Sequence, residues 1–235
     1  MRTQDCLLLF LIVLVAAFPG ASAASAAEPE AEPESGIFLI FSEGRRIGTE
    51  KFTITPGSAG FEAEGELQLE PPGGPNVSER CSLRLDANLR PSSYERRQEA
   101  PKKGTLTAKF ETSGTTLTSQ TEAGTRDQIF YLPDHDLVVL DTNFFHHYAF
   151  LIRLYHLSRP GLQSFTVFIP QEALPGTISL AFQGNETVPA GNTTGELDHF
   201  QATTDEVKIE IWATPEGEIQ RLLIPQANLE IVRQR

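Results

Sequence analysis

The sequence predicts a mainly β fold (β+α): a large curved antiparallel sheet, a half-barrel or spiral, wrapped around one long helix. Three observations predict this class. Segments in which apolar and polar residues alternate recur along most of the chain, which is typical of strands with one buried face. Gly, Pro, Asn and Asp fall between these segments, where turns are expected. One segment alone, residues 141–157, has the spacing of an apolar helix.

Residues 1–23 are predicted to be a secretory signal peptide. Arg2 supplies a positive charge, residues 6–18 form an apolar run, and Ala21-Ser22-Ala23 offers a cleavage site of small residues. The alternative, an uncleaved anchor, is disfavoured because the run is short and ends at Pro19-Gly20. We therefore expect export to the periplasm or cell envelope, or secretion, with no transmembrane segment after signal cleavage.

The mature chain is predicted to be a disordered tether followed by one domain. Residues 24–36 are rich in Ala, Glu and Pro, which cannot bury apolar surface, and we expect an acidic tether there. Residues 37–235 are expected to form a single β-rich domain. Cys6 would leave with the signal, so Cys81 would stand alone and the domain would contain no internal disulfide.

The formal net charge of the chain is −12. Nucleic acids and anionic membrane surfaces are bound through basic patches, so this charge argues against both as general partners.

Strands are predicted on both sides of the helix, and their alternation predicts which face is buried. In residues 61–69 the odd positions are apolar or Gly and the even positions are Glu or Gln. Before the helix we expect strands at residues 37–41, 47–54, 61–69, 81–89, 94–99, 105–111, 115–121, 128–132 and 137–140. After it we expect strands at residues 164–169, 177–183, 195–203, 206–213, 219–224 and 227–232, with a turn at Gly184-Asn185.

The helix is expected to run from Asp141 to Leu157. Asp141, Thr142 or Asn143 can cap its start, and Pro160-Gly161 stops it. Its apolar side is wide, and we expect His146 and Arg153 to mark the wetter side. The predicted apolar positions are Phe144, Phe145, Tyr148, Ala149, Leu151, Ile152 and Tyr155.

Several of these segments resemble a family of uncharacterised exported bacterial proteins, a domain-of-unknown-function group. The resemblance rests on the early hairpin at residues 44–50, the helix at 143–157, Phe168-Ile169-Pro170 and the hairpin at 212–223, and covers roughly residues 37–233. It implies a curved antiparallel sheet around a helix, similar to lipoprotein carriers of the LolA type. It also implies a non-enzymatic role in the cell envelope and a hydrophobic ligand.

From the residues and the resemblance, we expect an exported cell-envelope protein that holds a hydrophobic ligand, a lipid or a lipid-linked segment, in a concave sheet. The ligand-lining or core candidates are Phe144, Phe145, Tyr148, Leu151, Tyr155 and Trp212. If the aromatic side chains fill the space, no pocket remains and the role is structural. The first alternative is an envelope scaffold whose partner is a protein or hydrophobic peptide at an exposed strand edge or at the tether.

The second alternative is a hydrolase built on Asp134-His135-Asp136, whose other interpretation is a solvated turn. No GxSxG, HExxH or phosphate-loop motif supports an enzyme. His146 and His147 diverge by about 100° on a helix, so we expect them to form no metal site without a partner such as His135 or His199. Cys81 lies on an apolar face and is expected to be buried and inert. We therefore expect no metal and no cofactor.

Overall fold

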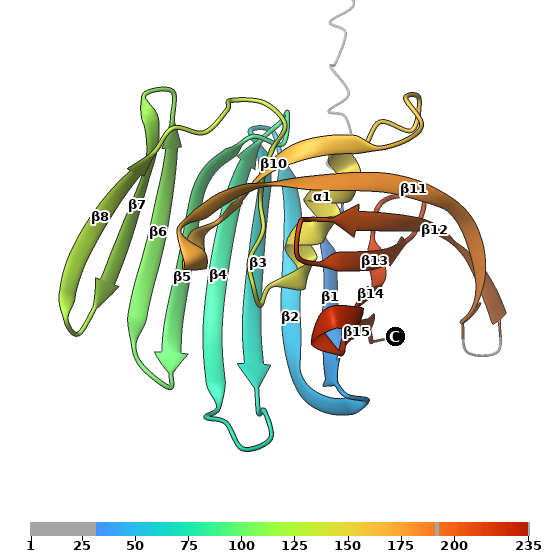
Figure 1. Ribbon diagram of the computed structural model, residues 1–235, viewed down its shortest axis with the longest axis horizontal. Coiled ribbons are helices and arrows are strands. Elements are labelled where there is room, and N and C mark those ends of the chain that lie inside the picture. The colour runs from blue at the N-terminus through green and yellow to red at the C-terminus, as the bar shows by residue number, and fades with distance from the viewer. Residues whose placement is uncertain (1–31, 191–192, 235) are drawn as a thin grey trace, which may run out of the picture.

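The computed structural model describes residues 32–190 and 193–234 of the chain. Fifteen strands in these residues form one sheet in the order β8-β7-β6-β5-β4-β3-β2-β1-β15-β14-β13-β12-β11-β10-β9 (Figure 1). The strands are β1 Glu34–Ser42, β2 Arg45–Gly57, β3 Gly60–Leu69, β4 Val77–Asp86, β5 Pro91–Ala100, β6 Gly104–Glu111, β7 Gly114–Thr121, β8 Gly124–Phe130, β9 Leu137–Val139, β10 Gln163–Ile169, β11 Leu174–Ala190, β12 Thr193–Thr203, β13 Lys208–Ala213, β14 Ile219–Ile224 and β15 Leu229–Arg233.

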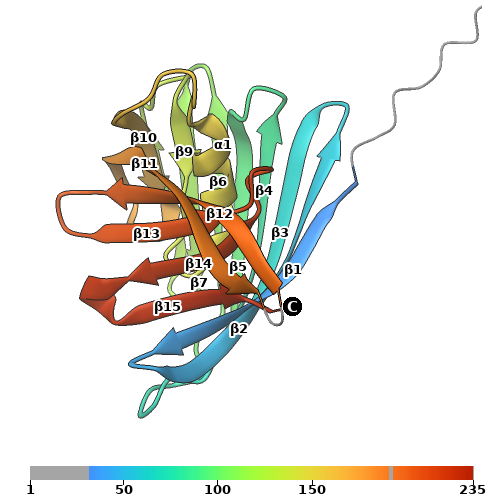
Figure 2. The ribbon, with the colours of Figure 1, turned by 90° about the vertical axis from the view of Figure 1, so that its right-hand side faces the viewer.

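The sheet is open, with β8 at one edge and β9 at the other. Every neighbouring pair is antiparallel except β9 and β10, which are parallel. The sheet curls so that its second half crosses in front of its first half, and helix α1 (Tyr148–Leu154) lies inside the curve (Figures 1 and 2). The predicted fold class, a large curved sheet around a helix, is confirmed at this level.

The helix is much shorter than predicted. It consists of a 3-10 turn, η1 (Phe145–His147), followed by α1, ten residues in all. Tyr155 is already extended (φ −72°, ψ 127°), and its hydroxyl donates a hydrogen bond to the Gly161 carbonyl at 2.7 Å. The prediction of one long helix over residues 141–157 is therefore wrong, because side-chain contacts of the next loop end the helix before Pro160-Gly161.

Each of the fifteen predicted strand segments overlaps a strand, and the differences have local causes. β4 begins at Val77 and ends at Asp86, whose carboxylate accepts N–H bonds from Asn88 and Arg90 and so closes a turn. Gly184-Asn185 forms no turn between strands: it lies within β11, where the pairing register with β12 shifts between Phe182 and Gly184. This register shift leaves one extra residue on β11, which forms a β-bulge, and Gly184 has a positive φ of 127° there.

The domain begins earlier than predicted. β1 starts at Glu34, so residues 34–36, assigned above to the tether, are part of a strand. The Glu34 carboxylate forms ion pairs with Arg153 at 2.8 Å and with Arg233 at 3.0 Å, which fix this strand to the helix and to β15. The predicted signal peptide and most of the predicted tether lie outside the described residues.

The core fills the space between the helix and the sheet. Five successive helix residues, Tyr148 to Ile152, are buried, so the helix packs on several sides. The hydrophobic core that contains them also includes residues from both halves of the sheet, for example Leu67 of β3 and Ile211 of β13. No helix in residues 32–190 or 193–234 combines the length and hydropathy needed to cross a bilayer.

Candidate functional site

The six predicted lining residues are all buried, at most 8% exposed, and they lie in two places. Five of them belong to the helix or directly flank it and are part of the hydrophobic core: Phe144, Phe145, Tyr148, Leu151 and Tyr155. Trp212 faces the opposite side of β13 from Ile211 and lies between the imidazole of His199 and the guanidinium of Arg221, at 4.7 Å from each. The structure therefore brings the first five together and places Trp212 apart from them.

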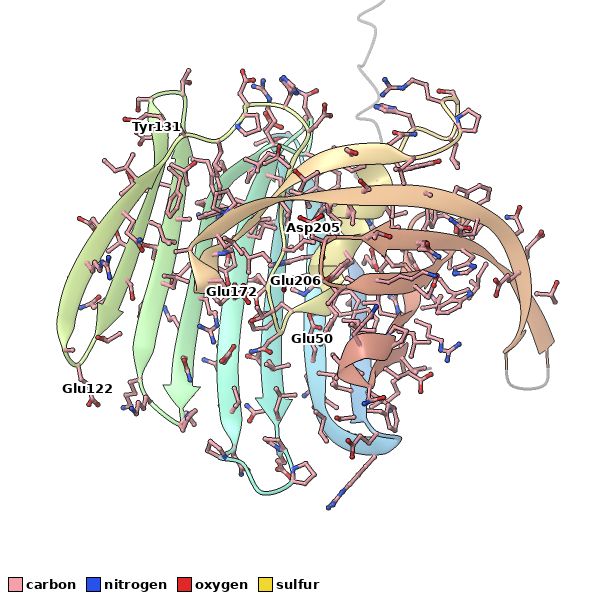
Figure 3. All side chains as sticks on the ribbon, in the orientation of Figure 1. Glu50, Glu122, Tyr131, Glu172, Asp205 and Glu206 are labelled. Carbon is pink, nitrogen blue, oxygen red and sulfur yellow. The ribbon has the colours of Figure 1, made fainter. Side chains whose placement is uncertain are left out.

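Beneath the start of the helix lies a buried polar centre, defined here as Glu50, Cys81, His146 and His147. Glu50 comes from β2 and is fully buried near the middle of the molecule (Figure 3). Its carboxyl group accepts the N–H of Phe145 at 2.8 Å and also pairs with Nδ1 of His146. A strand residue 95 positions away in the sequence thus provides the cap of the helix.

The predicted helix caps act elsewhere. Asp141 accepts the N–H of Asn143 at 2.8 Å, in the loop before the helix. Glu50 was missed because a lone Glu in a predicted strand is usually solvated. The sequence does indicate that Glu50 is buried. Glu50, Phe52 and Ile54 are two residues apart along the strand, so alternation alone places Glu50 on the buried face.

The two histidines contradict the expectation that His146 lies on the wetter side. Both are buried, and their ring centroids are 4.4 Å apart. His146 stacks on Phe52 of β2, while His147 turns its ring edge towards Tyr94 of β5. The helix has sheet on more than one side, so side chains that leave it in different directions all reach buried surroundings.

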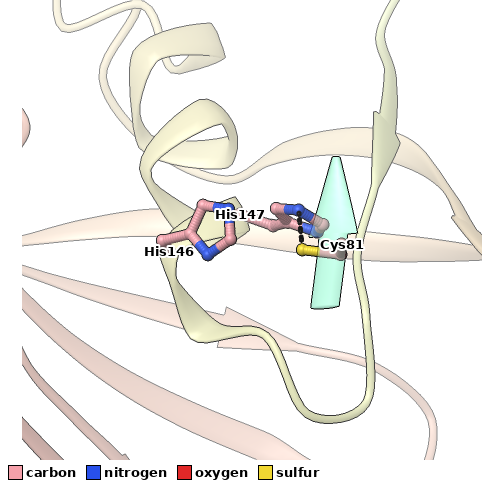
Figure 4. A group of neighbouring side chains, drawn as sticks. All are labelled: Cys81, His146 and His147. Atoms are coloured by element: carbon pink, nitrogen blue, oxygen red, sulfur yellow. Dashed lines mark hydrogen bonds between the residues drawn. The ribbon is translucent and has the colours of Figure 1, made fainter. Parts of the chain in front are cut away.

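Cys81 of β4 completes the centre. Its side chain is buried, as the alternation of its strand predicts, and Sγ lies 3.8 Å from Nε2 of His147 (Figure 4). One donor atom from each of Cys81, His146 and His147 lies within 4.8 Å of the other two. The partner that brings the adjacent histidines into one cluster is therefore Cys81, and neither His135 nor His199 takes part.

A second set of polar groups adjoins the centre. The Tyr94 hydroxyl donates a hydrogen bond to the Asp141 carboxylate and accepts one from the Gln171 amide at 2.8 Å. Glu79 of β4, also buried, is paired with the guanidinium of Arg96. Glu79 is in register with Cys81 on the buried face of its strand, which is the same signal that identifies Glu50.

Burial sets the protonation of these groups. Loss of solvation raises the pKa of Glu50 to about 8 and lowers the pKa of His146 to about 3. The same cause raises the pKa of the Cys81 thiol and lowers the pKa of His147. Near neutral pH the centre therefore holds a neutral carboxyl group, two neutral imidazoles and a thiol, and it carries no net charge.

The segment Asp134-His135-Asp136 differs from this centre because it is exposed. All three side chains are exposed, Asp134 pairs with Arg90 at 3.4 Å, and His135 Nδ1 lies 3.2 Å from Asp136. Asp136 has the positive φ of 53° that is common in turns. The arrangement is that of a solvated turn, and the three residues join none of the buried groups.

Four surface hollows in the described residues have volumes of about 260 to 450 Å³, and none of these four is lined by the six predicted residues. One of about 450 Å³ lies over β2 to β5 and is bordered by charged side chains of the polar face, such as Glu64, Glu66 and Arg80. These hollows are outside the aromatic interior that the sequence predicted as a ligand site.

Comparison with known proteins supports the fold and no more. No protein-family model matches the sequence, and no curated protein matches it. A crystal structure of a β-barrel-like protein of a domain of unknown function, DUF1849, from Brucella abortus is similar with a TM-score of 0.56 and 10% identity, over 86% of this chain and 95% of that one. A DUF1089 family protein from Pseudomonas aeruginosa matches with a TM-score of 0.46 and 15% identity, over 72% and 86% of the two chains.

Proposed function

We propose that the chain is an exported cell-envelope protein that acts by binding another protein and catalyses no reaction. The partner would contribute an extended segment that pairs with β8. The observation that carries this proposal is the open sheet, which ends in an exposed strand on one side.

In the described residues β8 pairs with β7 alone, so the other side of its backbone has unpaired N–H and C=O groups. The opposite edge strand, β9, is buried along its length. Ile129 of β8 is 64% exposed. Tyr131, which directly follows β8 and is labelled in Figure 3, is 86% exposed. Unpaired backbone with large apolar side chains beside it suits recognition by strand addition, in which hydrogen bonds supply affinity and side chains supply specificity.

A hydrophobic ligand inside the curve is the weaker candidate. The helix and its aromatic residues occupy that space, with Phe144, Phe150 and Leu151 at most 1% exposed. A lipid would have to displace the helix, whose start is held by Glu50. The LolA-like carrier role suggested by the resemblance stays a prediction that a lipid-uptake measurement can test.

Two observations support a role without catalysis. Cys81 and His147, the two reactive side chains that lie together in the described residues, are buried at 6% and 0% exposure. The exposed Asp134-His135-Asp136 turn has its first carboxylate engaged by Arg90. Export is supported by the pattern of residues 1–23, and N-terminal sequencing of the mature protein should then give a start near Ala24.

The docking proposal is tested by placing a photo-crosslinking residue at position 129 or 131 and irradiating intact cells. We expect one dominant protein adduct from both positions. The matched control is position 157, because Leu157 is an exposed apolar residue at 57% on another part of the surface.

Adducts that are equal at positions 129, 131 and 157, or absent at all three, would contradict the proposal. A crosslinked dimer of this chain would show that the partner at β8 is a second copy of the chain and would overturn the proposal of a different protein. With the crosslinking residue at position 129, Tyr131→Lys should weaken the adduct, and with it at position 131, Ile129→Lys should do so. Neither substitution should change the melting temperature, since both side chains are largely exposed.

A further inference from the structure

We propose that Cys81, His146 and His147 bind a divalent metal ion of the zinc class between the sheet and the helix, with Glu50 as the residue that positions His146. This site is separate from the β8 edge and does not depend on the binding role proposed above.

The donor geometry comes close to that of a zinc site. Zinc–sulfur and zinc–nitrogen bonds of about 2.3 Å and 2.1 Å place the two donor atoms about 3.6 Å apart in a tetrahedral site. Sγ of Cys81 and Nε2 of His147 are 3.8 Å apart, and the donor from His146 completes a triangle with no side above 4.8 Å.

The histidine nitrogens supply an independent observation. Nε2 of His146 and Nδ1 of His147 are buried and have no hydrogen-bond partner. Buried polar atoms in proteins are nearly always paired, and an unpaired one indicates a missing ion or ligand. An ion bound at Nε2 of His146 would give that atom its partner, and His147 would bind the same ion through Nε2, which lies 3.8 Å from Sγ of Cys81.

Glu50 provides the outer contact that histidine ligands require. A histidine that binds a metal through one nitrogen usually donates the other N–H to a carboxylate, which fixes the ring and its tautomer. Glu50 is paired with Nδ1 of His146 and is itself held by the Phe145 N–H, so Nε2 of His146 is the nitrogen left for the ion.

The charge of the site selects a divalent ion. On binding, Cys81 becomes a thiolate and Glu50 a carboxylate that accepts the Nδ1–H of His146. The thiol proton and one proton from the Glu50–His146 pair leave, so an ion of charge +2 replaces two protons. A neutral buried centre becomes a neutral buried metal site, which avoids the cost of an uncompensated charge. Thiolate and imidazole are the donors that zinc prefers.

The test uses the full chain in a Cys6→Ser background, so that Cys81 is the sole cysteine. Zinc(II) is titrated in competition with a chromophoric chelator, and cobalt(II) is used as the spectroscopic probe. We expect one ion per chain, with the sulfur-to-cobalt charge-transfer band and tetrahedral visible bands of a site with a thiolate ligand. X-ray absorption of the zinc form should show one sulfur neighbour.

Cys81→Ser and His147→Gln should each abolish stoichiometric binding, and Glu50→Gln should weaken it roughly 10- to 100-fold, the usual effect of an outer carboxylate. His135→Gln is the control, because His135 is exposed and pairs with Asp136 rather than with any residue of the centre, and it should bind like the parent. If a cysteine variant fails to fold, the sulfur neighbour in the parent protein still decides the proposal. Zinc bound without sulfur, or equal binding by the His147 variant and the parent, would overturn it.

Discussion

Glu50 and His146 lie 96 residues apart in the sequence, and their side chains meet in a fully buried contact between β2 and the helix. The same carboxyl group accepts the N–H of Phe145. One residue of the first hairpin thus holds both the backbone and the side chain at the start of the helix. We expect this contact to control the pH dependence of folding.

Glu50→Gln should change how the free energy of unfolding depends on pH. The pKa of Glu50 rises from 4.5 to about 8 on folding, so the folded state keeps a proton that the unfolded state loses. Stability from this group therefore falls as pH rises from 4.5 to 8. The pKa of His146 falls from 6.5 to about 3 on folding, so stability from this group rises as pH rises to 6.5. The lowered pKa of His147 acts in the same direction. The pKa of Asp141 rises from 3.8 to about 6 on folding, so stability from this group falls as pH rises from 3.8 to 6.

Of these four groups, only Glu50 still changes its contribution above pH 6.5, and on this account the parent should lose on the order of 2 kcal/mol between pH 6.5 and 8. The variant should be nearly flat over that interval. Urea denaturation in the presence of a metal chelator measures both slopes. A parent whose stability is as flat as that of the variant from pH 6.5 to 8 would show that Glu50 is ionised in the folded state.

Gly65→Ala should destabilise the protein by about 1–3 kcal/mol, the usual cost of overpacking a core. A Cβ at Gly65 of β3 would lie 2.7 Å from Cδ1 of Phe144 and 2.8 Å from Cε1 of His146, which leaves no room for it. Gly176→Ala is the control, because the nearest atom to its Cβ would be a Val167 methyl at the ordinary distance of 3.5 Å. Equal melting temperatures for the two variants would mean that the helix does not rest on β3 as described.

Tyr94→Phe should cost about 1–3 kcal/mol of stability, the penalty for leaving a buried polar group without its partner. The Tyr94 hydroxyl donates to the buried Asp141 carboxylate and accepts from Gln171, and Phe supplies neither contact. Tyr131→Phe removes the same atom from an exposed side chain and should change stability by less than about 0.5 kcal/mol. Chemical denaturation of both variants makes the comparison, and a loss that is equal in the two would refute the role of the buried pair.

Arg221→Ala should expose the indole of Trp212 to solvent. Trp212 is the single tryptophan of the chain, so its fluorescence reports this position alone. The Arg221 guanidinium covers one face of the ring at 4.7 Å, while the Trp212 N–H donates to Glu186 at 2.8 Å. We expect a red-shifted emission and faster quenching by acrylamide. Arg126→Ala on β8, away from the tryptophan, should leave both unchanged.

The candidate site was harder to predict than the fold. Alternation in residues 47–54 and 81–89 places Glu50 and Cys81 on buried faces, so two members of the centre are visible in the sequence. Helical spacing misplaced His146, because it treats the helix as having a single wet side, and it assigned no side to His147. The sheet curls around the helix start, and both His146 and His147 are covered.

Local sequence determined the strands of this protein, because period-2 alternation and turn residues act within a few positions of one another. The same local patterns could not set the length of the helix, since its start is held by Glu50 and its end by the contact between Tyr155 and Gly161. They could not show that Cys81 meets the two histidines, or that the sheet stays open at β8. Those features depend on how strands distant in sequence curve and pair, and only the tertiary structure decided them.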